Sequence, residues 1–310
     1  MIALERVTKR YGGTTALRDV SFRVPRGEIT GLLGRNGAGK TTALNLMTGY
    51  FPPDEGRVLV DGMDMLEQSR DCKRRIGYLP ERPPLYDEMS VRDYLGFVCD
   101  LREVAPRARR KHVEEILSLC GLGEMGDRLN GHLSRGYRQR VGIAQALCGS
   151  PEVLILDEPT VGLDPQQAVE IRELIRALGR EHTVLFSSHI LPEVQQLCSS
   201  VLILHEGRLV RSLQLTEEQR GEIRLRLTAA GQGNELAAAL RSVGCVRSVE
   251  ILSAADGEAE MRLTGEREDE RGRLEDQVFR LLSAKDVPIR EMRRERENLE
   301  EVFLESTRDA

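Results

Sequence analysis

Hydrophobic and polar positions divide the chain into three stretches before the C-terminal region. Residues 1–80 contain short alternating or wholly apolar runs, such as residues 29–33, that predict strands joined by turns. Residues 82–150 carry apolar side chains at helical spacing and predict a mainly helical region. Between 151 and 213, apolar runs of strand length, such as residues 153–156, alternate with helical ones. This alternation predicts an α/β fold with a parallel sheet and helices on its faces.

A polar stretch at residues 214–221 predicts a linker between residues 1–213 and a smaller unit, residues 222–310. Asn298, with Glu301 three residues later, resembles a capping box and predicts a terminal helix. The pattern before it predicts strand 222–228, helix 234–242, strands 246–252 and 258–264, helix 270–284 and strand 287–293. This βαββαβ order is typical of a small α+β ferredoxin-like domain. The charged residues at its centre, 266–273, are interpreted as a solvated face of the second helix.

Composition excludes several classes of protein. The 310 residues are 40% hydrophobic and 31% charged, as in a soluble globular protein, and no apolar run approaches the roughly 20 residues that span a bilayer. The N-terminus lacks a secretory signal pattern. We therefore expect a cytoplasmic protein whose membrane association depends on partners. A net charge of −5 and the lack of Trp disfavour a nucleic-acid partner. The six scattered cysteines predict buried, reduced thiols.

A glycine-rich loop carries the first candidate chemistry, between a predicted strand and a predicted helix. Glycines let backbone N–H groups turn inward around a phosphate, and the helix N-terminus adds its positive dipole end. Lys40 is expected to reach the β- and γ-phosphates, and the Thr41 hydroxyl to bind Mg²⁺. The loop therefore predicts a site for a nucleoside triphosphate. Its candidate binding residues are Gly34, Arg35, Asn36, Gly37, Ala38, Gly39, Lys40, Thr41 and Thr42.

Two carboxylates, Asp157 and Glu158, end the apolar run at residues 153–156. Adjacent residues of a strand point to opposite faces, so the two acids need not share a role. We expect Asp157 to hold Mg²⁺, directly or through water, and Glu158 to polarise the attacking water. An acidic pair after a strand is also a common start to a helix, but Pro159 and Thr160 directly afterwards favour the catalytic interpretation.

Three further segments carry a resemblance to a family. They are Leu-Ser-Arg-Gly-Tyr-Arg-Gln-Arg at 133–140, Gly-Leu-Asp-Pro at 162–165 and Ser-Ser-His at 187–189. In this order they resemble the signature motif, the D-loop and the switch-histidine segment of ABC ATPases, over about residues 1–215. The resemblance implies a P-loop NTPase fold with a mixed sheet, a helical subdomain at about 82–150, and hydrolysis of ATP with Mg²⁺.

In this family ATP is sandwiched between two chains. The resemblance implies that Ser134 and Gly136, at a helix N-terminus, bind the γ-phosphate held by the opposite chain. It also implies that Asp164 helps to organise the two-fold interface and that His189 contacts the γ-phosphate. Tyr11 matches the aromatic residue that stacks on adenine; a tyrosine of a turn or of the core is the alternative.

Two departures from the family pattern affect the expected chemistry. Glu81 stands where the family usually has Gln; either side chain offers an oxygen to Mg²⁺ and to the attacking water, but Glu81 adds negative charge near the γ-phosphate. Arg135 and Tyr137 stand where the signature usually has Gly and Gln. We expect catalysis to be retained and coupling to differ.

The pattern is most similar to bacterial ATP-binding subunits of ABC-2-type exporters, in particular the gliding-motility-associated branch. Residues 78–81, 133–141 and 298–303 carry this resemblance. It implies separately encoded polytopic permease subunits, a second ATP-binding subunit in a homodimer, and a place on the inner face of the plasma membrane. The loop at 82–86 is where such permeases insert a coupling helix, although a merely structural proline loop is the alternative.

Two other functions remain as alternatives. A soluble ABC ATPase acting on ribosomes or DNA is disfavoured, because the chain has one cassette and no heptad run. A regulatory ABC module with degenerate catalysis is disfavoured because Asp157, Glu158 and His189 are all present.

Overall fold

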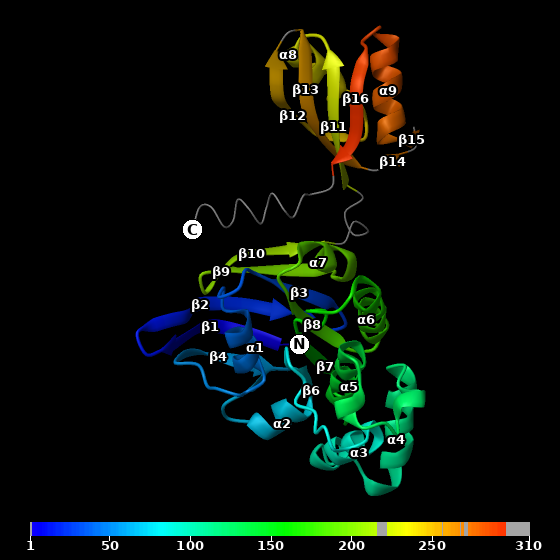
Figure 1. Cartoon of the computed structure of the whole chain (residues 1–310). Helices are drawn as coiled ribbons and strands as arrows, with labels where there is room; N and C mark the ends of the chain where they lie inside the picture. The colour runs from blue at the N-terminus through cyan, green and yellow to red at the C-terminus, as the bar shows by residue number, and fades with distance from the viewer. Residues whose placement is uncertain (1, 216–221, 256, 267, 270–271, 296–310) are drawn as a thin grey trace. The chain divides into compact units, whose positions relative to one another are not determined.

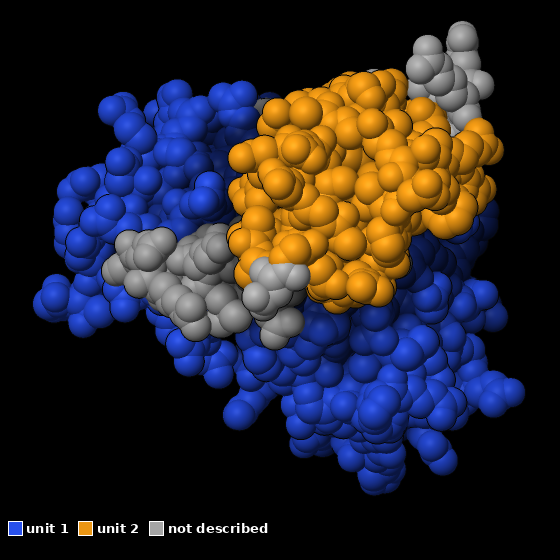
Figure 2. Space-filling model, turned by 90° about the horizontal axis from the view of Figure 1, so that it is seen from above, with its two compact units in different colours: residues 1–215, 305–310 blue, residues 216–304 orange. Residues whose placement is uncertain are grey.

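The computed structural model describes residues 2–215, 222–255, 257–266, 268–269 and 272–295 (Figure 1). These residues form two compact units (Figure 2), one within residues 2–215 and the other within residues 222–295. Most of the predicted linker lies outside the described residues, so its extent stays a prediction.

The first unit contains an antiparallel sheet built from β1 (Ile2–Tyr11), β2 (Thr14–Val24), β4 (Glu55–Val60) and β5 (Met63–Asp64), in the order β2-β1-β4-β5. Alternation along the end of β2 buries Val20, Phe22 and Val24 on one face and exposes the residues between them. This pattern is that of a strand with one face on the core and the other toward water.

The second sheet of this unit is mixed and has six strands in the order β10-β9-β3-β8-β7-β6. Neighbouring strands from β9 to β6 run parallel, and β10 is antiparallel to β9. The strands are β3 (Ile29–Leu33), β6 (Ile76–Leu79), β7 (Val153–Asp157), β8 (Thr183–Ser188), β9 (Ser200–His205) and β10 (Arg208–Gln214). Every residue of β7 and β8 is buried, which explains why their sequences are apolar runs rather than alternating ones.

Helix α1 (Lys40–Met47) packs against both sheets of the first unit. Its buried Leu44, Leu46 and Met47 belong to one hydrophobic cluster that includes residues of both sheets. The remaining core helices are α2 (Ser69–Arg74), α6 (Pro165–Leu178) and α7 (Leu191–Leu197). Helix α6 begins at the predicted cap, where the Asp164 carboxylate accepts a hydrogen bond from the Gln167 amide at 2.8 Å. The cluster therefore fixes α1, and the loop before it, relative to both sheets.

Three α-helices lie in the region for which helices were predicted. It contains α3 (Val91–Leu101), α4 (Pro106–Leu119) and α5 (Arg135–Leu147), which pack on one another. Helix α5 also packs against β6 and β7, so this region is joined to the six-stranded sheet through the helix that carries the signature residues.

The second unit has the predicted order of elements. These are β11 (Glu222–Ala230), α8 (Gly233–Leu240), β12 (Val246–Ala255), β13 (Glu258–Glu266), α9 (Leu274–Ala284) and β16 (Ile289–Glu295). The strands form an antiparallel sheet in the order β12-β13-β11-β16. Apolar residues of the sheet and of both helices make one separate core, with Leu227, Leu240 and Leu282 fully buried.

The prediction of a helix over residues 270–284 is wrong at its start. A short hairpin of β14 (Glu268–Asp269) and β15 (Gly272–Arg273) precedes α9, which begins only at Leu274. The buried face of α9 starts at Leu274 and continues through Val278 and Leu282, whereas Gly272 and Arg273 pair with β14 instead. Gly272 also disfavours a helix. The terminal helix predicted from Asn298 lies outside the described residues.

The composition also led to expectations about the cysteines and about membrane-spanning segments. All six cysteines are buried, as predicted. Among the described residues, no helix is both long enough and apolar enough to cross a bilayer.

Candidate functional site

The candidate site lies where the carboxyl ends of β3, β8, β7 and β6 meet. In the parallel register Leu33 pairs with Ser188, and Asp157 pairs with Ser187. The loops that follow these strands therefore leave the sheet at one edge, which is where ligands bind in open parallel sheets.

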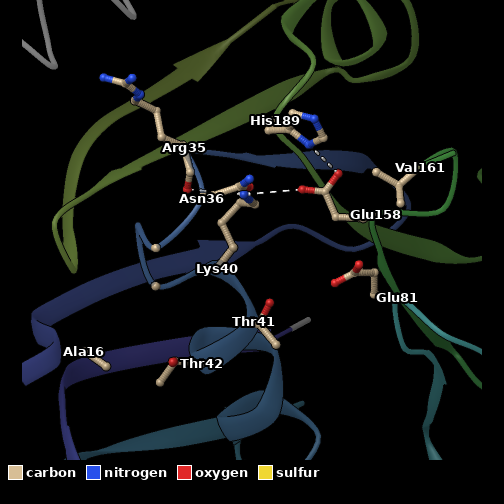
Figure 3. Close-up of a pocket in the computed structure, with 12 residues that line it drawn as sticks. Ala16, Arg35, Asn36, Lys40, Thr41, Thr42, Glu81, Glu158, Val161 and His189 are labelled. Atoms are coloured by element: carbon tan, nitrogen blue, oxygen red, sulfur yellow. Dashed lines mark hydrogen bonds and ion pairs between the residues drawn. The ribbon is translucent and has the colours of Figure 1, made fainter.

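A pocket of about 360 Å³ opens at this edge (Figure 3). It is formed by the glycine-rich loop, the first turn of α1 and the residues that follow β6, β7 and β8. Its lining residues are Ala16, Arg35, Asn36, Gly37, Gly39, Lys40, Thr41, Thr42, Glu81, Glu158, Val161 and His189. The structure thus brings most of the predicted nucleotide-binding and catalytic residues to one cavity, and its volume suits a small-molecule ligand.

The glycine-rich loop wraps around the Lys40 ammonium group. Lys40 Nζ donates a hydrogen bond to the Gly34 carbonyl oxygen at 2.7 Å. Gly39 has a φ of 102°, and a Cβ at this position would lie 2.7 Å from the Ala16 carbonyl oxygen. Only glycine fits this conformation and this close backbone approach.

Glu158 has an unusual backbone conformation for a residue with a side chain, with a φ of 47°. Its N–H donates to Ser187 Oγ at 2.9 Å, and its carbonyl oxygen accepts from the Val161 amide at 3.1 Å. Such strain persists only where surrounding contacts enforce it, and it is concentrated at functional sites. The conformation therefore supports a functional role for this residue.

The Glu158 side chain lies between two potential proton or charge partners (Figure 3). Its Oε1 is 3.3 Å from Lys40 Nζ, and its Oε2 is 2.9 Å from His189 Nδ1. Glu158 and Lys40 are each less than one-tenth exposed, so water screens their attraction only weakly. The residues predicted to bind phosphate and to activate water are therefore in direct contact in this structure.

Asp157 is not among the residues that line the pocket and is almost completely buried. Burial raises the pKa of its carboxyl, and the nearby Glu158 and Glu81 carboxylates raise it further, against the hydrogen bonds from Ser187 and Thr41. Ser187 Oγ donates to Asp157 Oδ1 at 2.5 Å. Ionised Asp157 thus lies in a region of excess negative charge, which a cation would offset.

The surroundings of Asp157 fit Mg²⁺. Thr41, Asp157 and Glu81 supply the hard oxygen donors that this ion prefers. Within the described ranges no cluster of three or more His, Cys, Asp or Glu side chains is arranged to hold a metal by itself.

Ser134, Gly136 and Asp164 are not among the residues that line the pocket. Ser134 Oγ caps α5 by accepting from the Tyr137 amide at 3.5 Å. Gly136 is buried against Gln167 of α6, where a Cβ would lie 2.8 Å from that side chain. The N-termini of α5 and α6 therefore lie side by side and present a second group of candidate residues. Their action on a nucleotide held by another chain stays a prediction.

Tyr11 also lies outside the set of pocket-lining residues. It is 42% exposed near the end of β1, with its ring edge-on to Phe51 at a centroid distance of 6.1 Å. Lys9 Nζ is 5.7 Å from the centroid of the Tyr11 ring. Stacking of this ring on adenine stays a prediction.

Ser187 is a site residue to which we assigned no role from the sequence. It links Asp157 and Glu158 by accepting from one and donating to the other, as the distances above show. Only the register of β7 against β8 places it there, so the local sequence contains no direct signal for this contact. Ala16 and Val161, which line the pocket, were missed for the same reason.

Comparisons with known proteins agree with this geometry. Residues 17–161 match the protein family described as ABC transporter. The chain is 38% identical over 216 residues to the ABC transporter ATP-binding protein NatA of Bacillus subtilis (strain 168), covering 68% of this chain and 88% of that protein. It is also 34% identical over 310 residues to the uncharacterized ABC transporter ATP-binding protein YhcH of the same organism, covering 99% of this chain and 96% of that protein.

A solved structure is similar over the first unit. The dimeric structure of MJ0796, a bacterial ABC transporter cassette, matches with a TM-score of 0.64 and 26% sequence identity. The match covers 70% of this chain and 99% of that chain. The same cassette has also been solved as a dimer in a post-hydrolysis state bound to ADP and Pi, with the same TM-score and identity.

Proposed function

Because the chain belongs to the ATP-binding proteins of ABC transporters, we propose that two copies of it close around Mg-ATP and thereby drive export through separate transmembrane subunits. The chain itself is the ATP-binding and ATP-hydrolysing subunit. The observation that carries the proposal is the contact of Lys40, Glu158 and His189 within one pocket at the carboxyl edge of the sheet.

The proposed chemistry uses the three contacting side chains in turn. Lys40, released from Glu158, binds the β- and γ-phosphates of ATP. Glu158 then accepts a proton from the water that attacks the γ-phosphorus, and ADP and phosphate leave. His189 orients the Glu158 carboxylate through Nδ1, which leaves its second ring nitrogen for the γ-phosphate. Thr41 and Asp157 would hold Mg²⁺, which would supply positive charge to offset the charge of the phosphates.

The second chain is proposed to contribute the face formed by α5 and α6. Its capped α5 N-terminus offers the Ser134 hydroxyl and the Gly136 amide to the γ-phosphate, and the helix dipole adds a favourable charge. Asp164, which caps α6 next to α5, is proposed to organise the interface. The dimeric MJ0796 cassette supports this arrangement by similarity.

Transport is proposed to require polytopic permease subunits at the inner face of the plasma membrane. The loop at 82–86, with Tyr86 about half-exposed, is the proposed contact for them. It is connected to the signature helix, because Arg138 of α5 donates to Asp87 at 2.6 Å. Similar proteins support a role in transport: one is a bacitracin transport ATP-binding protein of Bacillus licheniformis, and another is a lantibiotic transport ATP-binding protein of Streptococcus pyogenes.

The test uses the Glu158→Gln variant, which should bind ATP without turning it over. We expect it to accumulate as a dimer with Mg-ATP on sizing chromatography, while the wild-type chain hydrolyses ATP and stays mostly monomeric. A matched control adds Ser134→Asn, because Asn still caps a helix but lacks the hydroxyl offered to the partner's nucleotide. The double variant should bind ATP but form much less dimer. A Glu158→Gln chain that stays monomeric with saturating Mg-ATP would contradict the sandwich.

A further inference from the structure

Glu193 of α7 is a buried carboxylate outside the pocket, and three side chains converge on it. Its Oε2 accepts hydrogen bonds from Thr160 Oγ1 at 2.7 Å and from Ser188 Oγ at 3.1 Å. Its Oε1 faces Arg172 Nη1 of α6 at 3.4 Å. Glu193, Thr160 and Ser188 are each less than one-tenth exposed. Buried and multiply bonded, this carboxylate holds its neighbours more firmly than a surface contact would.

The two hydroxyl groups belong to the segments that carry the catalytic candidates. Thr160 lies two residues after Glu158, and Ser188 directly precedes His189. Ser188 Oγ also accepts from the Ile190 amide at 3.0 Å, so it fixes the backbone on both sides of His189. One carboxylate oxygen of Glu193 thus joins the chain just after Glu158 to the chain just before His189.

We propose that Glu193 is a positioning residue for ATP hydrolysis, which sets the Glu158–His189 contact by holding these two segments together. The proposal rests on the proposed roles of Glu158 and His189. Their side chains meet at 2.9 Å from two different loops, one after β7 and the other after β8. Small displacements of reacting groups have large effects on rate, so an anchor placed behind both loops affects turnover directly.

The phosphate-binding half of the pocket is not held by this anchor directly. Lys40 and the glycine-rich loop are held by α1 and by the loop's own backbone, and none of the described contacts of Glu193 reaches them. Loss of the anchor should therefore lower kcat without weakening nucleotide binding, because any displacement of Glu158 away from Lys40 would free the ammonium group for phosphate. If Glu193 served only to pack α7, loss of the anchor would lower the melting temperature of the protein. It would not lower kcat selectively relative to KM.

Two substitutions of Thr160 test the proposal as a matched pair. Thr160→Val keeps the shape and removes the hydroxyl, whereas Thr160→Ser keeps the hydroxyl. We expect Thr160→Val to lower kcat by about 10- to 100-fold with KM for ATP raised by no more than about twofold, and Thr160→Ser to restore most of the rate. Glu193→Gln removes the charge but keeps one acceptor oxygen, and it should lower kcat by a smaller factor. Combined with Thr160→Val, it should add little to the loss, because both changes break the same connection.

Steady-state ATPase assays on the full chain give these values, with ADP affinity and melting temperature as controls for folding. A Thr160→Val protein with wild-type kcat, or one in which KM rises and kcat does not change, would overturn the positioning role. If the Glu193→Gln protein fails to fold, the comparison of Thr160→Val with Thr160→Ser still tests the positioning role. Failure of the proposed function would look different: Glu158→Gln would then keep the wild-type rate whatever the Thr160 variants do.

Discussion

The contact between Lys40 and Glu158 predicts that Glu158 lowers the affinity of the chain for nucleotide, even if its side chain does not touch the nucleotide. Lys40 must leave the Glu158 carboxylate, 3.3 Å away, before it can bind phosphate. Glu158→Gln removes the charge from this competitor but leaves an amide oxygen as a weaker acceptor. We therefore expect the variant to bind Mg-ADP more tightly than the wild-type chain does. ADP is the suitable ligand because it lacks the γ-phosphate on which the proposed dimer depends.

The size of the effect follows from the geometry. Two unit charges 3.3 Å apart attract by about 5 kcal/mol at an effective dielectric constant of about 20. Most of this attraction is offset by the cost of removing both buried groups from water. The Gln oxygen also keeps a hydrogen bond from the ammonium group. A net change of about 1–2 kcal/mol remains, which corresponds to about 5- to 30-fold in the ADP dissociation constant.

The assay is calorimetric titration of Mg-ADP into wild-type and variant chains at the same ionic strength. Glu81→Gln is the matched control, because Glu81 lines the same pocket but has no described ion pair with Lys40. It removes the same charge from the cavity and reports any general repulsion of phosphate, provided that ADP is also titrated without Mg²⁺, because Glu81 is itself a candidate Mg²⁺ donor. The increase in ADP affinity caused by Glu158→Gln should exceed the increase caused by Glu81→Gln by at least severalfold.

Two results would refute the reasoning. An unchanged or weaker ADP affinity in Glu158→Gln would mean that the Lys40 contact does not compete with nucleotide. An equal gain in Glu81→Gln would assign the effect to the total charge of the pocket instead of to this pair.

Three further predictions concern single side chains. Lys40→Ala should abolish detectable binding of ATP in the same titration, because the cation that contacts the phosphates is lost; unchanged affinity would contradict the phosphate-loop assignment. Asp157→Asn should abolish hydrolysis yet raise the melting temperature of the nucleotide-free chain. The raised pKa of Asp157 means that its ionised form is less favourable in the folded than in the unfolded state, so stability is lost as the pH rises through that pKa. Each kcal/mol regained should raise the melting temperature by about 2–4 °C, and a fall measured by calorimetry would contradict this. Gly77→Ala should destabilise the first unit, since its Cβ would lie 2.0 Å from the Ala146 carbonyl oxygen; an unchanged melting temperature would show that α5 can move away.

The sequence by itself determined the elements and most of the candidate chemistry, because these depend on local patterns. The apolar runs of β7 and β8 predict buried parallel strands, and Asp164 with Pro165 predicts the start of α6. The glycine-rich loop predicts a phosphate site from spacing alone. The family was also identifiable from ordered motifs, although the finer resemblance to the gliding-motility-associated branch stays a prediction.

Tertiary structure decided the features that depend on contacts between distant segments. The pairing of β7 with β8 places Ser187 between Asp157 and Glu158, and the packing of α7 buries Glu193 behind Thr160 and Ser188. No local propensity indicates such a contact, because a serine or glutamate near a strand end is more often a solvated loop residue. The late start of α9 has the same origin, since only the position of the core shows where a helix has something to pack against. Local patterns thus specify which groups are available, and the long-range register of the sheet decides which of them meet.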